Sequence, residues 1–216
     1  MRTLICCPHW DDEAISCGGL IQNRGGSGEK SDAVGVIVMH ERTYNYKRPH
    51  PRETEAEISD FHSAQSVLGY DYGNSFEFIE GEPGHTGYYP LLKAIEAELR
   101  DFGPTEVIIP SGDDLNQDHR HLNHVCKIAL RPINLKNVKR VLEFCGLDGT
   151  VKTPNYFVPL TEVQMHTKLR AISAYRRERR TTGPRSPENV MAQARVWGSM
   201  CGVDFAEGYR VVLEKE

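Results

Sequence analysis

The amino-acid sequence predicts an α/β fold in which a mostly parallel sheet is covered by helices. Short apolar runs rich in β-branched residues alternate with segments of helical periodicity along most of the 216 residues. This alternation is typical of strands joined by right-handed helical crossovers. A chain of this length also favours one domain over two large ones.

Five segments are expected to be the strands of this sheet. The run at 33–39 has the sequence AVGVIVM and carries no charge, as expected of a strand that is buried on both faces. The run at 2–7 is similar and ends at Pro8. The other expected strands are 75–79, 105–110 and 138–145, and the pattern is weakest at 75–79.

Four segments between these strands have apolar residues at helical spacing. In the segment 90–102, for example, Leu91, Leu92, Ile95 and Leu99 share one face. The expected helices are 13–23, 52–68, which ends before Gly69, 90–102 and 121–130.

After Phe144 the pattern changes. We expect a loop that contains Pro154 and Pro159, helices over about 161–180 and 187–200 with a turn-rich connection at 178–187, and a last strand at 209–213. The whole chain, 1–216, is therefore predicted to be one Rossmann-like domain. Its core spans about 1–147, and a smaller C-terminal appendage of helices and a strand spans about 148–216.

Composition excludes several classes of protein. The chain has 26 Lys plus Arg against 30 Asp plus Glu, and its net charge of −4 offers no general attraction to nucleic acid. Its mean hydropathy is −0.50, and no apolar run approaches the length of a membrane span. The six cysteines form no C-x-x-C pair, and no signal peptide is evident, so a cytoplasmic location is expected.

The segment 7–13, Cys-Pro-His-Trp-Asp-Asp-Glu, places one imidazole and three carboxylates directly after the first expected strand. Ligands of open α/β sheets bind at the carboxyl ends of the strands, so both the place and the residue types favour a functional site. The alternative is structural, because Asp11 or Asp12 can cap the helix that follows.

A second polar cluster, 111–124, follows the strand expected at 105–110, and it contains His119, His121 and His124. Catalytic zinc typically has three protein ligands and one open position. His9, Asp12 and His119 fit that set, because the first two converge across a turn and the third arrives from a neighbouring strand end. Asp11 then remains as a general base beside the metal. His121 and His124 fit an ordinary helix equally well.

Four ordered patterns in this chain resemble the zinc-dependent N-acetylglucosaminyl deacetylases of the PIG-L/LmbE type. Residues 8–13 resemble the signature P-H-x-D-D-E, and residues 116–119 resemble H-x-D-H. Residues 52–55 with Leu68-Gly69 resemble an R-x-x-E helix of that family. The last pattern, R-x-x-G followed by Ala-Glu, matches Arg195, Gly198, Gly202, Ala206 and Glu207.

The resemblance implies that one Zn²⁺ is bound by His9, Asp12 and His119, with Asp11 as general base and then general acid. It also implies that Asp118 orients a histidine and that Arg52 contacts the substrate. For Arg52, a salt bridge to Glu53 or Glu55 is the alternative. Iron or cobalt would suit the same ligands.

Two residues depart from the family pattern. Trp10 stands where the family often has proline, and it either lines the pocket mouth or packs in the core. Asn116 stands where a histidine would stabilise the oxyanion; either its amide performs a weaker version of that role, or His121, His124 or His40 replaces it.

The function expected from these patterns is removal of an acetyl group from a small N-acetylated saccharide or metabolite. The segments expected to select the substrate are 41–51, 80–89 and 148–159. A non-catalytic metal- or sugar-binding relative is the main alternative, because of Asn116. A metal-dependent nuclease is a weaker one, suggested by His119, Asn123 and His124.

Overall fold

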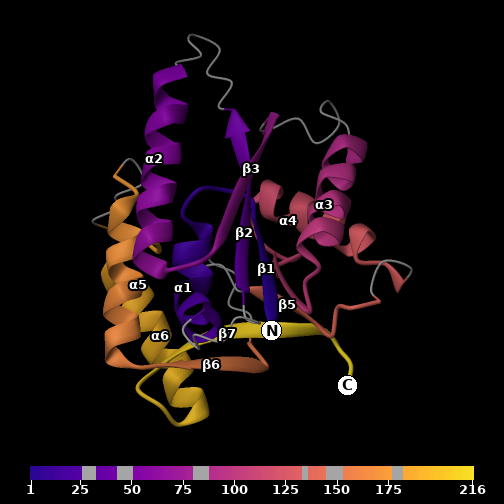
Figure 1. Cartoon of the computed structure of the whole chain (residues 1–216). Coiled ribbons are helices and arrows are strands. Elements are labelled where there is room, and N and C mark those ends of the chain that lie inside the picture. The colour runs from indigo at the N-terminus through magenta and orange to yellow at the C-terminus, as the bar shows by residue number, and fades with distance from the viewer. Residues whose placement is uncertain (26–32, 43–50, 80–87, 133–135, 145–152, 177–181) are drawn as a thin grey trace.

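The computed structural model describes residues 1–25, 33–42, 51–79, 88–132, 136–144, 153–176 and 182–216. Within these ranges, the side chains of 40–42, 51–54 and 77–79 are not described. The α/β prediction is confirmed: a seven-stranded sheet has the order β3-β2-β1-β4-β5-β7-β6 (Figure 1).

Five parallel strands form the main part of the sheet. They are β1 (Arg2–Cys7), β2 (Ala33–Arg42), β3 (Tyr72–Ile79), β4 (Glu106–Pro110) and β5 (Arg140–Phe144). From β1 the chain first builds β2 and β3 on one side, and it then places β4 and β5 on the other. The carboxyl ends of β1 and β4 therefore flank the point at which the strand order reverses, which is where open α/β sheets bind ligands.

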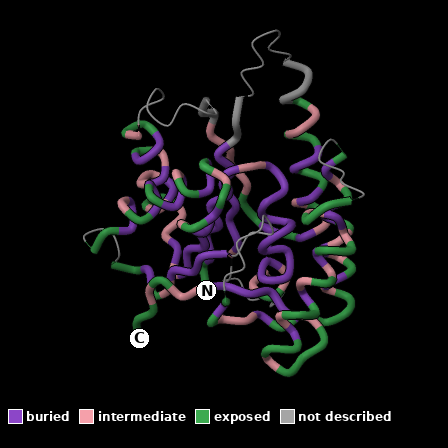
Figure 2. Tube along the Cα trace, turned by 180° about the vertical axis from the view of Figure 1, so that it is seen from behind, coloured by how far each residue is buried: buried purple, intermediate pink, exposed green. Residues whose placement is uncertain are grey.

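Helices cover both faces of the sheet. One face carries α1 (Asp12–Gly25), α2 (Pro51–Leu68), α5 (Glu162–Ala174) and α6 (Pro187–Cys201), and the other carries α3 (Tyr88–Phe102) and α4 (Gln117–Ala129) (Figure 1). The residues of β1 alternate between the two cores, with Ile5 and Cys7 in one and Leu4 and Cys6 in the other. Figure 2 shows the buried strands enclosed by helices whose outer sides are exposed.

The C-terminal residues extend the same sheet. β7 (Phe205–Glu214) pairs antiparallel with β5, and β6 (Tyr156–Leu160) pairs antiparallel with β7. The prediction of a loop around Pro159 was wrong, because residues 156–160 form a strand. Proline is tolerated there because β6 is the edge strand, which needs fewer backbone donors.

Other boundaries also differ from the prediction; β2, for example, ends at Arg42 rather than at residue 39, and β3 begins at Tyr72 rather than at residue 75. α4 begins at Gln117 rather than at residue 121, and β7 begins four residues before the expected 209. α5 ends at Ala174 rather than near 180. Part of the turn-rich connection, residues 177–181, lies outside the described residues.

A buried carboxylate joins the C-terminal strand to α1. Glu207 of β7 is fully buried, and its two carboxylate oxygens accept hydrogen bonds from the backbone N–H groups of Gly19 and Leu20, each at 2.7 Å. Lys168 of α5 and the hydroxyl of Tyr209 also donate to it. Four donors thus compensate the cost of burying this charge.

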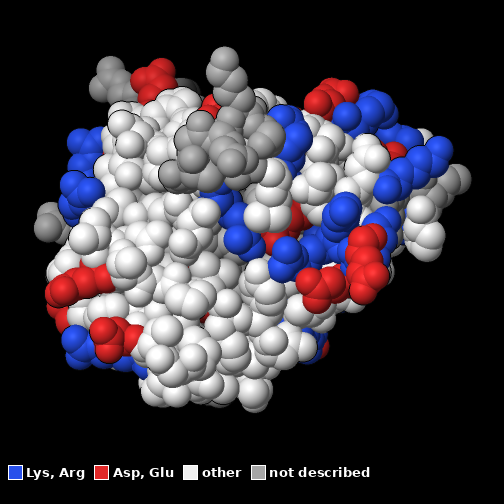
Figure 3. All heavy atoms as spheres, turned by 60° about the horizontal axis from the view of Figure 1, so that its bottom comes forward, with Lys and Arg blue, Asp and Glu red and all other residues white. Residues whose placement is uncertain are grey.

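The amino-terminal edge of the sheet holds ion pairs. Buried Glu106 lies 3.0 Å from Arg24 and 3.1 Å from Arg140, and it accepts a hydrogen bond from Thr3. Figure 3 looks toward the edge where the strands begin and shows acidic and basic side chains intermixed beside a wide uncharged area. In the part of the chain that the structure describes, no helix is both long enough and apolar enough to cross a membrane.

A third buried carboxylate, Glu143 of β5, holds α4 against the sheet. Its oxygens lie 2.8 Å from the charged nitrogens of Lys127 on α4 and Arg210 on β7, and Asn123 donates a hydrogen bond of 2.7 Å. Burial raises the pKa of Glu143, but Lys127, Asn123 and Arg210 outweigh burial and hold this pKa below its usual value of 4.5. The ionised carboxylate therefore stabilises the folded protein.

We expect Glu143→Gln to lower the free energy of unfolding at pH 7 by about 1.5–3 kcal/mol, because a charged buried acceptor is lost. A depressed folded-state pKa stabilises the protein above the unfolded-state pKa, and this contribution is lost as pH falls. The difference between variant and wild type should therefore be full at pH 7 and shrink below about pH 4.5 in urea unfolding.

Glu214→Gln is the matched control, because Glu214 is 59% exposed and lies 3.7 Å from Arg140 on the same sheet. It should unfold like the wild type. A Glu143→Gln protein whose deficit stays constant from pH 7 to pH 3 would contradict the assigned pKa direction.

Candidate metal centre

The turn after β1 separates the side chains of two adjacent aspartates. Asp11 has a φ of 89°, in the left-handed region that aspartate tolerates better than most residues. Its carbonyl accepts the backbone N–H of Ile15 at 2.9 Å, so α1 begins at the next residue, Asp12. Both carboxylates are buried, with Asp12 directed at two histidines and Asp11 toward Arg185.

The second part of the site is the start of α4. Asn116 is the N-cap: its side-chain oxygen accepts the backbone N–H of Asp118 at 2.8 Å. Its own backbone N–H donates to Asp114 Oδ1 at 2.9 Å. This cap starts the helix before the expected residue 121 and places Asp118 and His119 in its first turn.

Three side chains converge between these two segments. Ligand atoms of His9, Asp12 and His119 all lie within 4.8 Å of one another. Asp12 Oδ2 lies 3.2 Å from His9 Nδ1 and 3.4 Å from His119 Nε2. Neither of these buried nitrogens makes a hydrogen bond. Two imidazole nitrogens and a carboxylate oxygen that face one point in this way fit a divalent metal ion.

Each of the two histidines has another carboxylate on its far nitrogen. Asp118 Oδ2 is hydrogen-bonded to His9 Nε2 at 3.3 Å, and Asp114 Oδ2 lies 3.1 Å from His119 Nδ1. Such carboxylates orient metal-binding histidines and fix their tautomers. Sequence reasoning placed Asp114 within the 111–124 cluster but gave it no role.

The electrostatics of the site reflect this crowding of carboxylates. Burial lowers the pKa of His9, but Asp118 and Asp12 outweigh it and raise this pKa to about 10. For His119, Asp12 and Asp114 outweigh burial, and the pKa is raised to about 9. Burial raises the pKa of Asp114, yet His119 and the N–H of Asn116 hold it below its usual value. Without a metal, these raised pKa values favour protonated imidazoles, whose positive charge offsets part of the negative charge of the aspartates.

The third carboxylate of the 7–13 segment faces the core. Glu13 is fully buried and accepts a hydrogen bond from the hydroxyl of Tyr175 at the end of α5. Burial, only partly offset by this hydrogen bond, raises the pKa of Glu13 to about 7. This residue therefore links the motif to the C-terminal half rather than contributing to the three-residue cluster.

Five other residues were candidates for the site: Trp10, His40, Arg52, His121 and His124. Trp10 is 8% exposed, and its ring lies 5.0 Å from that of Phe61. Of the two alternatives for Trp10, this is packing in the core. His121 and His124 lie beside the ring of Tyr88, at 6.4 and 5.7 Å. The side chains of Arg52 and His40 fall outside the described residues, as do most of the three segments expected to select the substrate.

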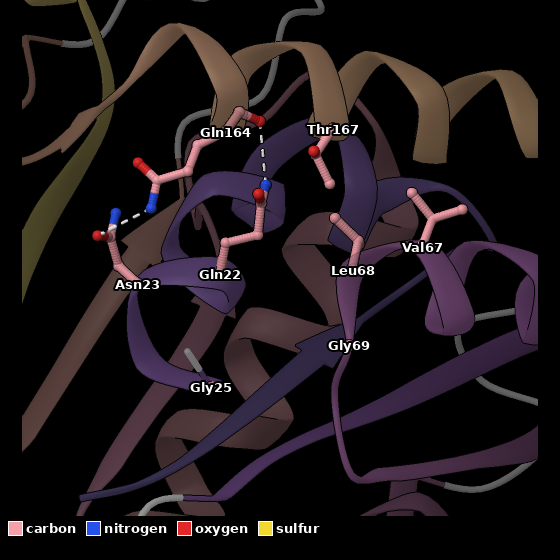
Figure 4. Close-up of a pocket in the computed structure, with 8 residues that line it drawn as sticks. All are labelled: Gln22, Asn23, Gly25, Val67, Leu68, Gly69, Gln164 and Thr167. Carbon is pink, nitrogen blue, oxygen red and sulfur yellow. Dashed lines mark hydrogen bonds between the residues drawn. The ribbon is translucent and has the colours of Figure 1, made fainter. Parts of the chain in front are cut away.

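A hollow on the surface lies at the other end of α1 from Asp12. It is formed where the ends of α1 and α2 meet the start of α5 (Figure 4). Gln22 donates to the carbonyl of Gln164, whose side chain donates to Asn23, so these polar groups satisfy one another. The hollow is thus separate from the candidate metal centre.

Solved structures share this fold across nearly the whole of this chain. A conserved protein of Thermus thermophilus, TT1542, is 25% identical with a TM-score of 0.81, covering 99% of this chain and 96% of that one. The N,N'-diacetylchitobiose deacetylase of Pyrococcus horikoshii is 19% identical, with a TM-score of 0.73 over 98% of this chain and 84% of that one.

A protein with a different activity is also similar. GalB of Pseudomonas putida, a 4-carboxy-2-hydroxymuconate hydratase, is 18% identical with a TM-score of 0.71, over 100% of this chain and 98% of that one. None of the curated protein sequences matches the chain significantly. Residues 4–130, more than half of the chain, match the family described as PIG-L: GlcNAc-PI de-N-acetylase. The chain therefore belongs to the PIG-L family of de-N-acetylases.

Proposed function

We propose that this protein is a metal-dependent hydrolase that removes the acetyl group of an N-acetylated amino sugar or a related small amide. The observation that carries the proposal is the convergence of His9, Asp12 and His119, and the buried carboxylate of Asp11 belongs to the residue next to Asp12 in the chain. Membership in a family of de-N-acetylases supports the reaction class. The deacetylase from Pyrococcus horikoshii supports a small acetylated saccharide as the substrate class.

Zn²⁺ held by His9, Asp12 and His119 would acidify a water molecule and polarise the acyl carbonyl. Asp114 and Asp118 hold the two imidazoles in orientation through their far nitrogens. Asp11 takes a proton from water as the water oxygen bonds to the carbonyl carbon. When the C–N bond breaks, the same carboxyl group gives that proton to the amine nitrogen, and acetate and the free amine leave.

Asn116 has a limited part in this proposal. Its side-chain oxygen already accepts the N–H of Asp118, so only its amide NH₂ is left to donate to an oxyanion. A neutral donor of this kind supplies less stabilisation than a protonated histidine. The arrangement therefore also favours a second candidate, a relative that binds metal and sugar without turnover.

We expect Asp114→Asn to lower zinc affinity by about 10- to 100-fold, because the amide keeps the acceptor for Asn116 N–H but loses the charge facing His119. Competition with a chromophoric chelator at fixed pH measures this affinity. Asp113→Asn is the matched control, because Asp113 is 62% exposed and pairs with Arg210. Stoichiometric zinc in a folded His119→Ala protein would show that the ligand set is wrong.

The catalytic role of Asp11 is tested by acetate release from a panel of soluble N-acetylated sugars, glycosides and aminoglycosides. Asp11→Asn should keep the fold, since asparagine also tolerates a positive φ, and should keep its zinc. We expect it to lose at least about 100-fold in kcat, because the proton acceptor is gone. Asp101→Asn, at a site 77% exposed, is the control.

The outcomes of this assay separate the candidate functions. Wild-type turnover in the Asp11→Asn protein would remove Asp11 from the mechanism. Zinc and saccharide binding without acetate release from any substrate would favour the non-catalytic relative. Because GalB shares the fold, unsaturated hydroxy acids belong in the panel, and water addition to them without acetate release would identify a hydratase instead.

A further inference from the structure

A positive charge reaches the candidate active site from the C-terminal half of the chain. Arg185 lies in the turn before α6, and its Nη1 is 3.8 Å from Asp11 Oδ1. Only 13% of the Arg185 side chain and 4% of the Asp11 side chain are exposed. The turn belongs to the 178–187 connection, to which sequence reasoning gave no role in the site.

The turn that carries Arg185 is held by its own hydrogen bonds. Gly183 has a φ of 90°, and its carbonyl accepts the backbone N–H of Ser186 at 3.0 Å and the side chain of Asn189 at 2.6 Å. Ser186 then caps α6. Arg185 therefore extends from a fixed backbone, which reduces the entropy cost of holding a long side chain in the site.

Arg185 contributes positive charge to a site that is rich in carboxylates. The two segments that form the site carry four buried aspartates: Asp12, Asp114 and Asp118, which face the two histidines, and Asp11, which faces Arg185. A divalent ion compensates two of these charges. The resemblance expects a histidine at position 116, but this chain has the neutral N-cap Asn116 there. Arg185 supplies a fixed positive charge beside Asp11.

Stability alone does not account for this pair. At 3.8 Å, the contact from Nη1 to Oδ1 is electrostatic rather than a hydrogen bond. Taken alone, a contact at this distance does little to repay the desolvation of two largely buried charges. The contact does, however, place a positive charge beside Oδ1 of the Asp11 carboxylate, which favours one orientation of that group.

We propose that Arg185 is a positioning residue that holds the Asp11 carboxylate in place for amide hydrolysis. This inference rests on the proposed function, and it assigns a step to a segment that lies beyond the residues matched by the family, 4–130. Arg185 acts through Asp11 and need not touch the substrate.

The test compares Arg185→Gln and Arg185→Lys with the wild type, each loaded with zinc and assayed for acetate release. We expect Arg185→Gln to lower kcat by about 10- to 100-fold, as misplacement of a catalytic group does, and to leave KM little changed. Arg185→Lys should restore part of the loss by restoring the charge. Arg170→Gln, an exposed arginine on α5, is the matched control.

A double-mutant cycle shows whether Arg185 works through Asp11. In the Asp11→Asn background, followed with stoichiometric enzyme, Arg185→Gln should cause no further loss. An equal loss in both backgrounds would mean that the guanidinium acts on the substrate directly, and it would overturn the proposal. Unchanged kcat in Arg185→Gln, or a change in KM alone, would overturn it as well.

A readout without turnover separates this inference from the proposed function. In metal-free protein, the changes in Tm for Asp11→Asn and Arg185→Gln should be non-additive, because the charges interact. Additive changes would show that the pair is not coupled and would overturn the proposal. If the wild-type protein releases no acetate while the changes in Tm are coupled, the proposed function is wrong, and Arg185 has no role in catalysis. If the wild-type protein is active while the changes in Tm are additive, only the positioning role of Arg185 is wrong.

Discussion

The architecture of the site depends on Asp12, whose carboxylate connects the two segments that form it. Asp12 Oδ2 accepts the backbone N–H of His9 at 3.0 Å and faces ring nitrogens of both His9 and His119. The same residue begins α1, so the positive end of the helix dipole also favours its charge. A single oxygen thus fixes the turn after β1 and sets the position of α4 against it. The left-handed backbone of Asp11 supports this arrangement, because the side chains of Asp11 and Asp12 then face different partners.

Much of the fold could be predicted, because its evidence is local. The strands of the parallel sheet contain apolar runs rich in β-branched residues, and their burial on both faces follows from helices on both sides. The cluster of His9, Asp12 and His119 could be anticipated for a related reason. Polar residues that follow two strands of a parallel sheet lie at one edge, and the strand order places β1 beside β4.

What the sequence did not reveal depends on tertiary contacts. β6 contains a proline and was expected to be a loop, and only its pairing with β7 at the edge of the sheet makes it a strand. Asp114 resembles its neighbour Asp113 in sequence, yet one is buried against His119 and the other is exposed beside Arg210. Arg185 is separated from Asp11 by most of the chain. No local periodicity encodes such contacts, so only the folded structure distinguishes these residues.

Glu207 has a further consequence for how this protein can be divided. The N–H groups of Gly19 and Leu20, in the middle of the helix that begins at Asp12, are bound by a carboxylate near the C-terminus. The matched region, 4–130, therefore contains the site residues but not the acceptor for part of their supporting helix. Cutting the chain after β5 would leave two buried amide donors without that acceptor and would expose the flank of β5. We therefore expect the matched region and the C-terminal half to unfold as a single cooperative unit, and a domain exchange at that boundary to disrupt both.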